Sequence, residues 1–121
     1  MIRVSDLAAK VVEVGEANPD TSYPERYTDI TGESCDYKDT CRYQVNGQPA
    51  CIVGVALHEL GVSIETLEMF DLSGDSSIYQ LMRDYSGVYF ELDDEDAQDF
   101  VSLAQEDQDM GDRKWGSVIA L

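Results

Sequence analysis

Apolar residues recur at helical spacing near the start of the chain and predict a helix there. Ser5 is placed as its N-cap, and Asn18–Pro19 ends it because the residue before a proline avoids helical geometry. The inward face of this helix consists of Leu7, Ala8, Val11, Val14 and Ala17. From residue 18 to residue 40 no steady periodicity follows, so we expect a long, partly ordered loop.

A β-hairpin is predicted around Asn46–Gly47, the dipeptide that most strongly favours a tight hairpin turn. Pro49 cannot donate a hydrogen bond to a strand ladder, so it lies at a sheet edge or opens the next helix. We favour the first helical position. The helix that follows contains Gly54, which allows close approach of another backbone segment, and ends at Gly61, a typical left-handed cap. Its apolar stripe is Ile52, Val53, Ala56, Leu57 and Leu60.

Two more short helices are predicted in the middle of the chain. Ser63 caps the first, which turns Leu67 and Phe70 inward. A serine between residues 73 and 77 caps the second, which ends at Gly87. The stripe of this second helix is Ile78, Leu81, Met82 and Tyr85. Residues 88–92 are either a strand or a buried connector, since periodicity does not decide between them.

The last third of the chain predicts a long acidic helix and a short closing helix. Asp93 or Asp94 caps the acidic helix, whose first turn holds carboxylates that the helix dipole stabilises. Its predicted inward face is Ala97, Phe100, Val101 and Ala104. After Gly111 the closing helix begins at Trp115, which we expect to pack against the first helix or the helix from Ile52 to Leu60.

These elements predict an α+β, mainly α fold with five or six short helices and one small β-hairpin. The 121 residues and 43% hydrophobic content suit a single domain spanning residues 1–121. No apolar run approaches the ~20 residues that cross a bilayer, so we expect a soluble, intracellular protein that does not bind membranes. In that setting the three cysteines should be reduced.

Charge adds a functional expectation to this fold. The formal net charge is -17, and eleven carboxylates lie between Asp84 and Asp112 without a single Lys or Arg. Concentrated negative charge steers cationic partners and repels nucleic acid and anionic membranes. The carboxylates expected on the outer surface of the acidic helix are Asp94, Glu95, Asp99, Glu106 and Asp109. We predict that they contact a basic surface on a partner protein.

The cysteines and the one histidine suggest metal or thiol chemistry, but their spacing argues against both. Cys35, Cys41, Cys51 and His58 are separated by six, ten and seven residues, whereas zinc ligands usually come in pairs two to four residues apart. We therefore expect no zinc or other cofactor, with Cys41, Cys51 and His58 as weak candidates for metal ligands only.

Catalysis by a cysteine would need Cys51 as the nucleophile and His58 as its base, but the two residues would stand two helical turns, or ~10 Å, apart. Cys41 faces Cys51 only if the hairpin loop has three residues, because a two-residue loop offsets them.

Two oxygen-rich segments are also poor metal sites. Residues 71–78 begin like a calcium loop, but the sixth place lacks glycine and the twelfth is Met82 instead of a bidentate Glu. The run from Asp93 to Asp96 is more typical of a solvated helix start than of a magnesium site. With no phosphate-binding glycine loop and no Ser-His-Asp arrangement with a second histidine, we expect no enzymatic activity.

Three segments carry a resemblance to a known group of proteins. The stretch from Cys41 to Gly61 holds a Cys-x-Tyr entry, the Asn-Gly turn, Pro-x-Cys-Ile-Val-Gly and Leu-His-Glu-Leu-Gly. It resembles short hypothetical proteins encoded by actinobacterial phages and actinobacteria. Leu7 to Pro19 and Gln105 to Gly116 look like that group's first helix and its Gln-Asp-x-Gly-x-x-Trp-Gly tail. The resemblance implies a viral or mobile-element context, a host cytoplasm and an accessory role, and it supplies no activity.

Charge and resemblance together predict a non-enzymatic, phage-encoded accessory protein that binds a host protein through its acidic helix. The alternative is a nucleic-acid mimic, whose carboxylates imitate phosphates and block a host DNA-binding or defence protein. A third class, a small metal- or thiol-dependent enzyme or sensor, requires the thiols and His58 to converge beside a pocket.

The charge distribution predicts that salt stabilises the fold. Repulsion among the carboxylates between residues 84 and 112 should strain the native state at low ionic strength, although carboxylates at helix starts oppose this effect. Added salt or modest acidification should therefore raise the melting temperature, measured by circular dichroism. A melting temperature that stays constant from low to moderate salt would contradict the prediction.

Overall fold

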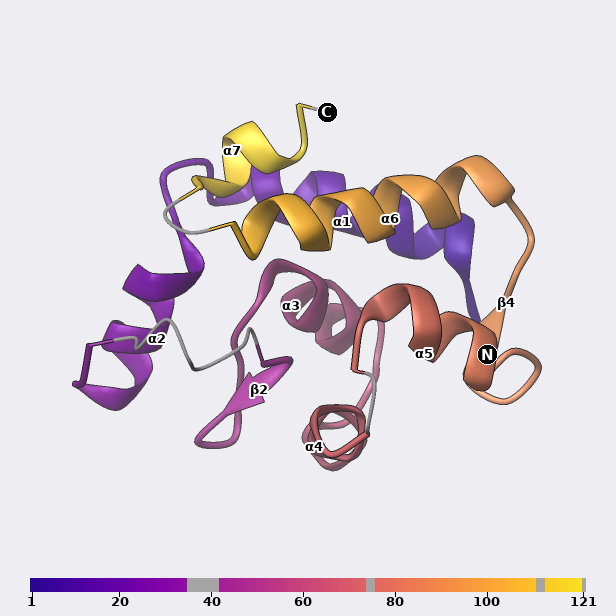
Figure 1. The fold of residues 1–121 in the computed structure, drawn as a ribbon, viewed down its shortest axis with the longest axis horizontal. Helices are drawn as coiled ribbons and strands as arrows, with labels where there is room; N and C mark the ends of the chain where they lie inside the picture. The colour runs from indigo at the N-terminus through magenta and orange to yellow at the C-terminus, as the bar shows by residue number, and fades with distance from the viewer. Residues whose placement is uncertain (35–41, 74–75, 111–112, 121) are drawn as a thin grey trace.

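The computed structural model describes residues 1–34, 42–73, 76–110 and 113–120. Within these ranges it contains seven helices and two sheets of two strands each (Figure 1). The helices are α1 (Val4–Ala17), α2 (Tyr23–Thr31), α3 (Ile52–Glu59), α4 (Ile64–Asp71), α5 (Ile78–Asp84), α6 (Glu95–Gln108) and α7 (Trp115–Val118). The strands are β1 (Ile2–Arg3), β2 (Gln44–Val45), β3 (Gln48–Pro49) and β4 (Phe90–Glu91). The predicted α+β, mainly α class with a small hairpin is therefore confirmed.

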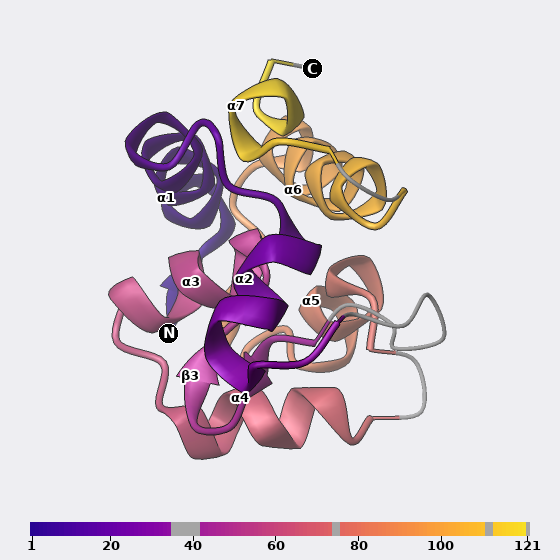
Figure 2. The same cartoon turned by 90° about the vertical axis from the view of Figure 1, so that its left-hand side faces the viewer.

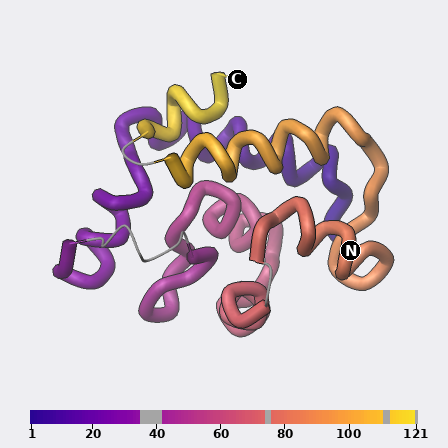
Figure 3. Tube along the Cα trace, in the orientation of Figure 1, coloured from indigo at the N-terminus to yellow at the C-terminus, as the bar shows by residue number. Residues whose placement is uncertain are grey.

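The helices form two layers, which are clearest when the molecule is viewed from the side (Figure 2). In the upper layer α1 and α6 lie side by side, and α7 packs on both of them. Beneath them α3 contacts α1 and α6, while α5 contacts α6. Below these, α4 packs against α3 and the β2–β3 hairpin. The trace in Figure 3 shows that the upper layer joins segments from the two ends of the sequence.

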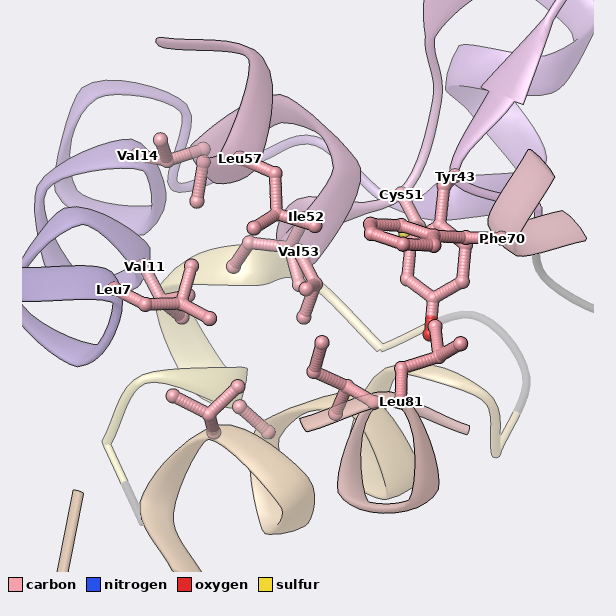
Figure 4. Packing of buried hydrophobic residues seen from close by; sticks show 14 of the residues in the cluster. Leu7, Val11, Val14, Tyr43, Cys51, Ile52, Val53, Leu57, Phe70 and Leu81 are labelled. Atoms are coloured by element: carbon pink, nitrogen blue, oxygen red, sulfur yellow. The ribbon is translucent and has the colours of Figure 1, made fainter. Parts of the chain in front are cut away.

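The core lies between the two layers. Leu7, Val11 and Val14 of α1 are buried against α3, which contributes Ile52 and Leu57 from its facing side (Figure 4). Phe70 of α4 extends this cluster and packs edge-on against the ring of Tyr43, with 6.1 Å between ring centroids. These side chains belong to one contiguous cluster of buried apolar residues, which is why the two layers pack as a unit.

The start of the chain differs from the expectation for Ser5. Helix α1 begins at Val4, and its N-cap residue Arg3 makes no side-chain cap bond. The Ser5 hydroxyl instead donates to the carboxylate of Asp93, and the Ser5 N–H donates to the same carboxylate at 3.0 Å. Immediately before α1, strand β1 pairs in parallel with β4, and Ile2 lies opposite Phe90. Residues 88–92 therefore include a short strand, with Phe90 buried.

Helix α2 lies within the segment that was predicted to be a loop, so that prediction is wrong for residues 23–31. The Ser22 hydroxyl caps the helix by accepting from the Glu25 N–H, and Pro24 occupies its first turn. Ser22 and Glu25 have the spacing of a capping box, which is a helix-start signal. The sequence analysis missed the helix because its apolar periodicity is weak. Arg26 in this helix donates to the Pro49 carbonyl from Nε and Nη2, at 2.9 and 2.5 Å. Residues 35–40 lie outside the described part of the chain.

The hairpin has a two-residue loop, Asn46–Gly47. Their φ angles of 52° and 78° match the mirror-image turn that suits twisted strands. Gln44 pairs with Pro49 and Val45 with Gln48, so Pro49 ends a strand and is not the first helical residue. The preference for a helical Pro49 is therefore wrong, and α3 begins at Ile52 instead. The edge of a two-stranded sheet tolerates the missing proline N–H.

The two glycines of the α3 segment have the predicted roles. A Cβ on Gly54 would overlap the backbone carbonyl oxygen of Tyr43, so only glycine permits the helix to lie this close to the hairpin. Gly61 has a φ of 100°, and the Val62 N–H donates to the Leu57 carbonyl at 3.0 Å. This is the left-handed C-terminal cap that the sequence indicated.

Helix α6 carries two buried glutamines that bind the N-termini of other helices. Gln108 accepts from the Ile52 N–H at 2.8 Å, and Gln105 accepts from the Ile78 N–H at 2.6 Å. Gln105 also donates to the Tyr43 hydroxyl at 2.8 Å, and that hydroxyl donates to the Ser76 carbonyl. The predicted inward face was therefore incomplete, since it omitted both glutamines, and Phe100 is only partly buried.

Trp115 closes the domain as expected. Its side chain is only 1% exposed, and α7 packs against α1 and α6. The Trp115 N–H donates to the Thr21 carbonyl at 2.7 Å, and the Gly116 N–H donates to the Pro19 carbonyl at 3.0 Å. Packing against the first helix is confirmed, whereas the contact with the Ile52–Leu60 helix is not among the main contacts of α7.

The glutamine contacts predict a specific loss of stability. Gln108→Met keeps the length of a side chain that is 1% exposed but removes the acceptor for the Ile52 N–H. A buried N–H without a partner costs about 1–3 kcal/mol, so urea denaturation should show a loss of that size in the free energy of unfolding. Gln98→Met, at a partly exposed position on the same helix, is the control and should change it by less than about 0.5 kcal/mol. Equal losses in both variants would refute a capping role.

Candidate protein-interaction surface

The acidic face consists of Asp94, Glu95, Asp99, Glu106 and Asp109, and all five residues are exposed. Glu95, Asp99 and Glu106 lie within α6 at separations of four and seven residues, which places them on one side of the helix. At 1.5 Å per residue they are about 6 and about 10.5 Å apart along the axis. Asp94 and Asp109 lie at the two ends, as the N-cap and C-cap residues. The predicted exposure of these side chains is confirmed.

Three residues of the acidic face, Glu95, Asp99 and Glu106, take no part in the ion pairs that the described residues form. Those pairs join Arg3 to Asp6, Lys10 to Glu13, Lys114 to Glu25 and Arg113 to Asp107. None includes Glu95, Asp99 or Glu106, and the last turn of α6 has no basic residue. Asp94 uses one carboxylate oxygen to accept from the Ala97 N–H at 3.1 Å. The negative field of this face is therefore directed into solvent.

An exposed leucine, which the sequence analysis did not identify, lies among these carboxylates. Leu103 is 52% exposed and follows Asp99 by four residues and precedes Glu106 by three. Positions three and four apart are neighbours on a helix surface, so both carboxylates flank the leucine. The signal in the sequence was an apolar residue outside the predicted inward stripe. A single exposed leucine is common on protein surfaces, which is why that signal is weak.

A cleft of about 440 Å³ lies beside the N-terminal end of α6. Tyr79, Arg83 and Leu92 line it together with Asp93, Asp94, Glu95 and Gln98. The Arg83 guanidinium donates to the Tyr79 hydroxyl at 2.6 Å and lies over the same ring. The cleft thus continues the acidic face toward α5 and adds an exposed aromatic ring to it.

The run from Asp93 to Asp96 does not converge on one point. Asp93 accepts from Ser5, Asp94 accepts from the Ala97 N–H, and no group of three or more potential metal ligands occurs among the described residues. The hydroxyl and then the N–H of Ser5 hold the pKa of Asp93 below its ordinary value. Two of the four carboxylates, Asp93 and Asp94, thus accept from groups in the first turns of α1 and α6.

The thiol and the imidazole are not brought together. Cys51 is fully buried, and its Sγ accepts from the Gly54 N–H at 3.2 Å as the N-cap of α3. His58 is exposed, with Nδ1 2.9 Å from the Val62 carbonyl oxygen. The hairpin has a two-residue loop and not the three-residue loop, and the Cys51 N–H donates to the Arg42 carbonyl at 3.2 Å. Cys35 and Cys41 themselves lie outside the described residues.

Asp71, the first residue of the calcium-like segment, has a structural role. Its carboxylate accepts from the Tyr43 N–H at 2.7 Å and from the Gln44 N–H at 3.2 Å, joining α4 to β2. Burial raises the pKa of Asp71, although the two backbone donors oppose that effect. The Asp71 carboxylate oxygens are therefore used to bind the backbone at the start of the hairpin. Residues 74 and 75 of the calcium-like segment lie outside the described part of the chain.

Comparison of the chain with protein-family models, curated proteins and solved structures found no match. Among the described residues, no helix has the length and apolar character needed to span a membrane. The functional argument therefore rests on the surface itself.

The Ser5 contact predicts how Asp93 titrates. In a carboxyl NMR titration the pKa of Asp93 should lie below the ordinary 3.8, and Ser5→Ala should raise it. A depressed pKa in the folded state stabilises the fold above the unfolded pKa, and this is lost as pH falls through the folded pKa. The stability difference between wild type and Ser5→Ala should therefore be largest near neutral pH and shrink in acid. Ser86→Ala, at an exposed serine, is the control, and an unchanged Asp93 titration in Ser5→Ala would contradict the assignment.

Proposed function

We propose that this protein is a non-enzymatic binding protein whose acidic face docks onto a basic surface of another protein. The observation that carries the proposal is the exposed, unneutralised set of Glu95, Asp99 and Glu106 on one side of α6. Complementary charge across an interface raises the association rate and selects the partner. The opposite side of α6 is anchored by Gln105 and Gln108, so the acidic face is carried by a rigid element.

The partner in this proposal is a host protein in a bacterial cytoplasm. This part rests on the resemblance of the chain to short proteins of actinobacterial phages and actinobacteria. A phage-encoded accessory protein acts on its host by binding, so it needs no catalytic centre. The use of the Cys51 thiol as a buried helix cap agrees with a role outside thiol chemistry.

The alternative, a nucleic-acid mimic, uses the same carboxylates differently. A mimic presents negative charge at regular, phosphate-like intervals and occupies a groove that reads phosphates. On α6 the exposed Leu103 interrupts the carboxylates between Asp99 and Glu106. An apolar side chain at this point favours a protein surface with an apolar element over a phosphate-reading groove.

Charge reversal tests the proposal. Glu95→Lys, Asp99→Lys and Glu106→Lys combined should abolish capture of partners from an actinobacterial host lysate, because like charges would then face each other. In wild type, the captured partners should elute as salt is increased. The fold should persist by circular dichroism, since all three side chains are exposed.

A matched triple variant separates the acidic face from net charge. Glu16→Lys, Glu59→Lys and Glu68→Lys change the net charge by the same amount at exposed positions near the C-terminal ends of α1, α3 and α4. This control should capture the same partners as wild type. If the α6 variant also captures them with unchanged salt dependence, the acidic face is only a solvated surface and the proposal fails.

A further inference from the structure

We propose that Leu103 is the apolar anchor of the acidic face and that the partner presents a cationic amphipathic helix to it. This inference rests on the proposed function and adds the partner's chemistry. Half of the Leu103 side chain is exposed, although α6 has a well-formed buried side on which an apolar residue could lie. The exposed leucine has the exposed carboxylates Asp99 and Glu106 four residues before it and three after it.

The spacing around Leu103 suits a second helix. Asp96, Phe100, Leu103 and Asp107 follow one another at intervals of four, three and four residues, which is the spacing of a helix–helix seam. Phe100 is partly buried and packs against the core, three residues before Leu103 on the same line. Along this line on α6, Asp96 lies before the apolar pair Phe100 and Leu103, and Asp107 lies after it.

The charges beside the line from Asp96 to Asp107 determine which charge a partner helix must carry to pack there. Glu95, Asp99 and Glu106 form a neighbouring row, with all three side chains exposed. A helix packed along the apolar pair would place its own flanking positions over that row, where lysine or arginine is favoured and carboxylates are repelled. The 14 residues of α6 give a contact about 21 Å long, which matches about four turns of a partner helix.

A second copy of this chain is a poor occupant. Two acidic faces brought together would oppose like charges along the whole contact, which disfavours pairing. The apolar pair is also too small to offset that repulsion without cations beside it. Charge complementarity thus favours a basic helix from another protein over self-association.

Synthetic peptides test the inference directly. The probe is a helical peptide with leucine at the heptad a and d positions and lysine elsewhere, and a second peptide has serine in place of leucine. Binding is measured by fluorescence anisotropy at several salt concentrations. We expect Leu103→Ala to weaken binding of the leucine peptide about tenfold, as for an interface anchor, without changing the salt dependence. Leu72→Ala, at a leucine that is 80% exposed outside α6, is the matched control and should bind like wild type.

The outcomes separate this inference from the proposed function. The serine peptide should bind wild type and Leu103→Ala equally, because it has no apolar group for the anchor. If the triple reversal on α6 removes binding while Leu103→Ala does not, the acidic face functions without an anchor and this inference is wrong. Failure of wild type to prefer the leucine peptide also refutes it. A dimer in sedimentation analysis that Leu103→Ala dissociates would identify a second copy as the occupant and would likewise refute it.

Discussion

Two buried glutamine side chains of α6 hold the starts of α3 and α5 and thereby join the two layers of this domain. The first residues of α3 and α5, Ile52 and Ile78, are both fully buried, and the first N–H groups of a helix have no partner within the helix itself. Gln108 accepts from the first N–H of α3 and Gln105 from the first N–H of α5. Because Gln105 also donates to Tyr43, the hairpin is joined to the same helix. A buried polar network of this kind is stabilising only when its members are satisfied together.

This anchoring explains how a helix with so many carboxylates can form one wall of the core. The rotation of α6 about its axis is determined by its buried residues, so the remaining positions must face solvent. The residues buried along α6 are Ala97, Val101, Ala104, Gln105 and Gln108. Carboxylates at the helix start are favoured by the dipole, whereas those near its end have no such compensation.

The motifs singled out between Cys41 and Gly61 and between Gln105 and Gly116 include residues with structural roles in this fold. Cys51 caps α3, Gly54 lets the helix approach the hairpin, and Gly61 ends it. In the closing segment Trp115 is buried, and a Cβ on Gly116 would lie 2.9 Å from the Pro19 Cβ. These motifs therefore describe how the domain is built and leave its chemistry open. The proposed function rests instead on the outer face of α6, where Glu95, Asp99 and Glu106 are exposed.

Local patterns in the sequence determined the elements whose causes are local. The apolar stripes of α1, α3 and α5, the Asn46–Gly47 turn and the outward direction of the acidic residues all follow from spacing along one segment, although Ala17, predicted on the inward face of α1, is exposed at its end. Contacts between distant segments decided the rest. Ser5 and Asp93, 88 positions apart, meet beside the pairing of β1 with β4, and Gln108 is buried where α3 presents the N–H of Ile52. Leu103 is exposed for the same reason, since the packing of α6 determines which of its apolar residues face the core. No single segment contains that information, because the free energy of each contact depends on both partners and on the water that folding removes.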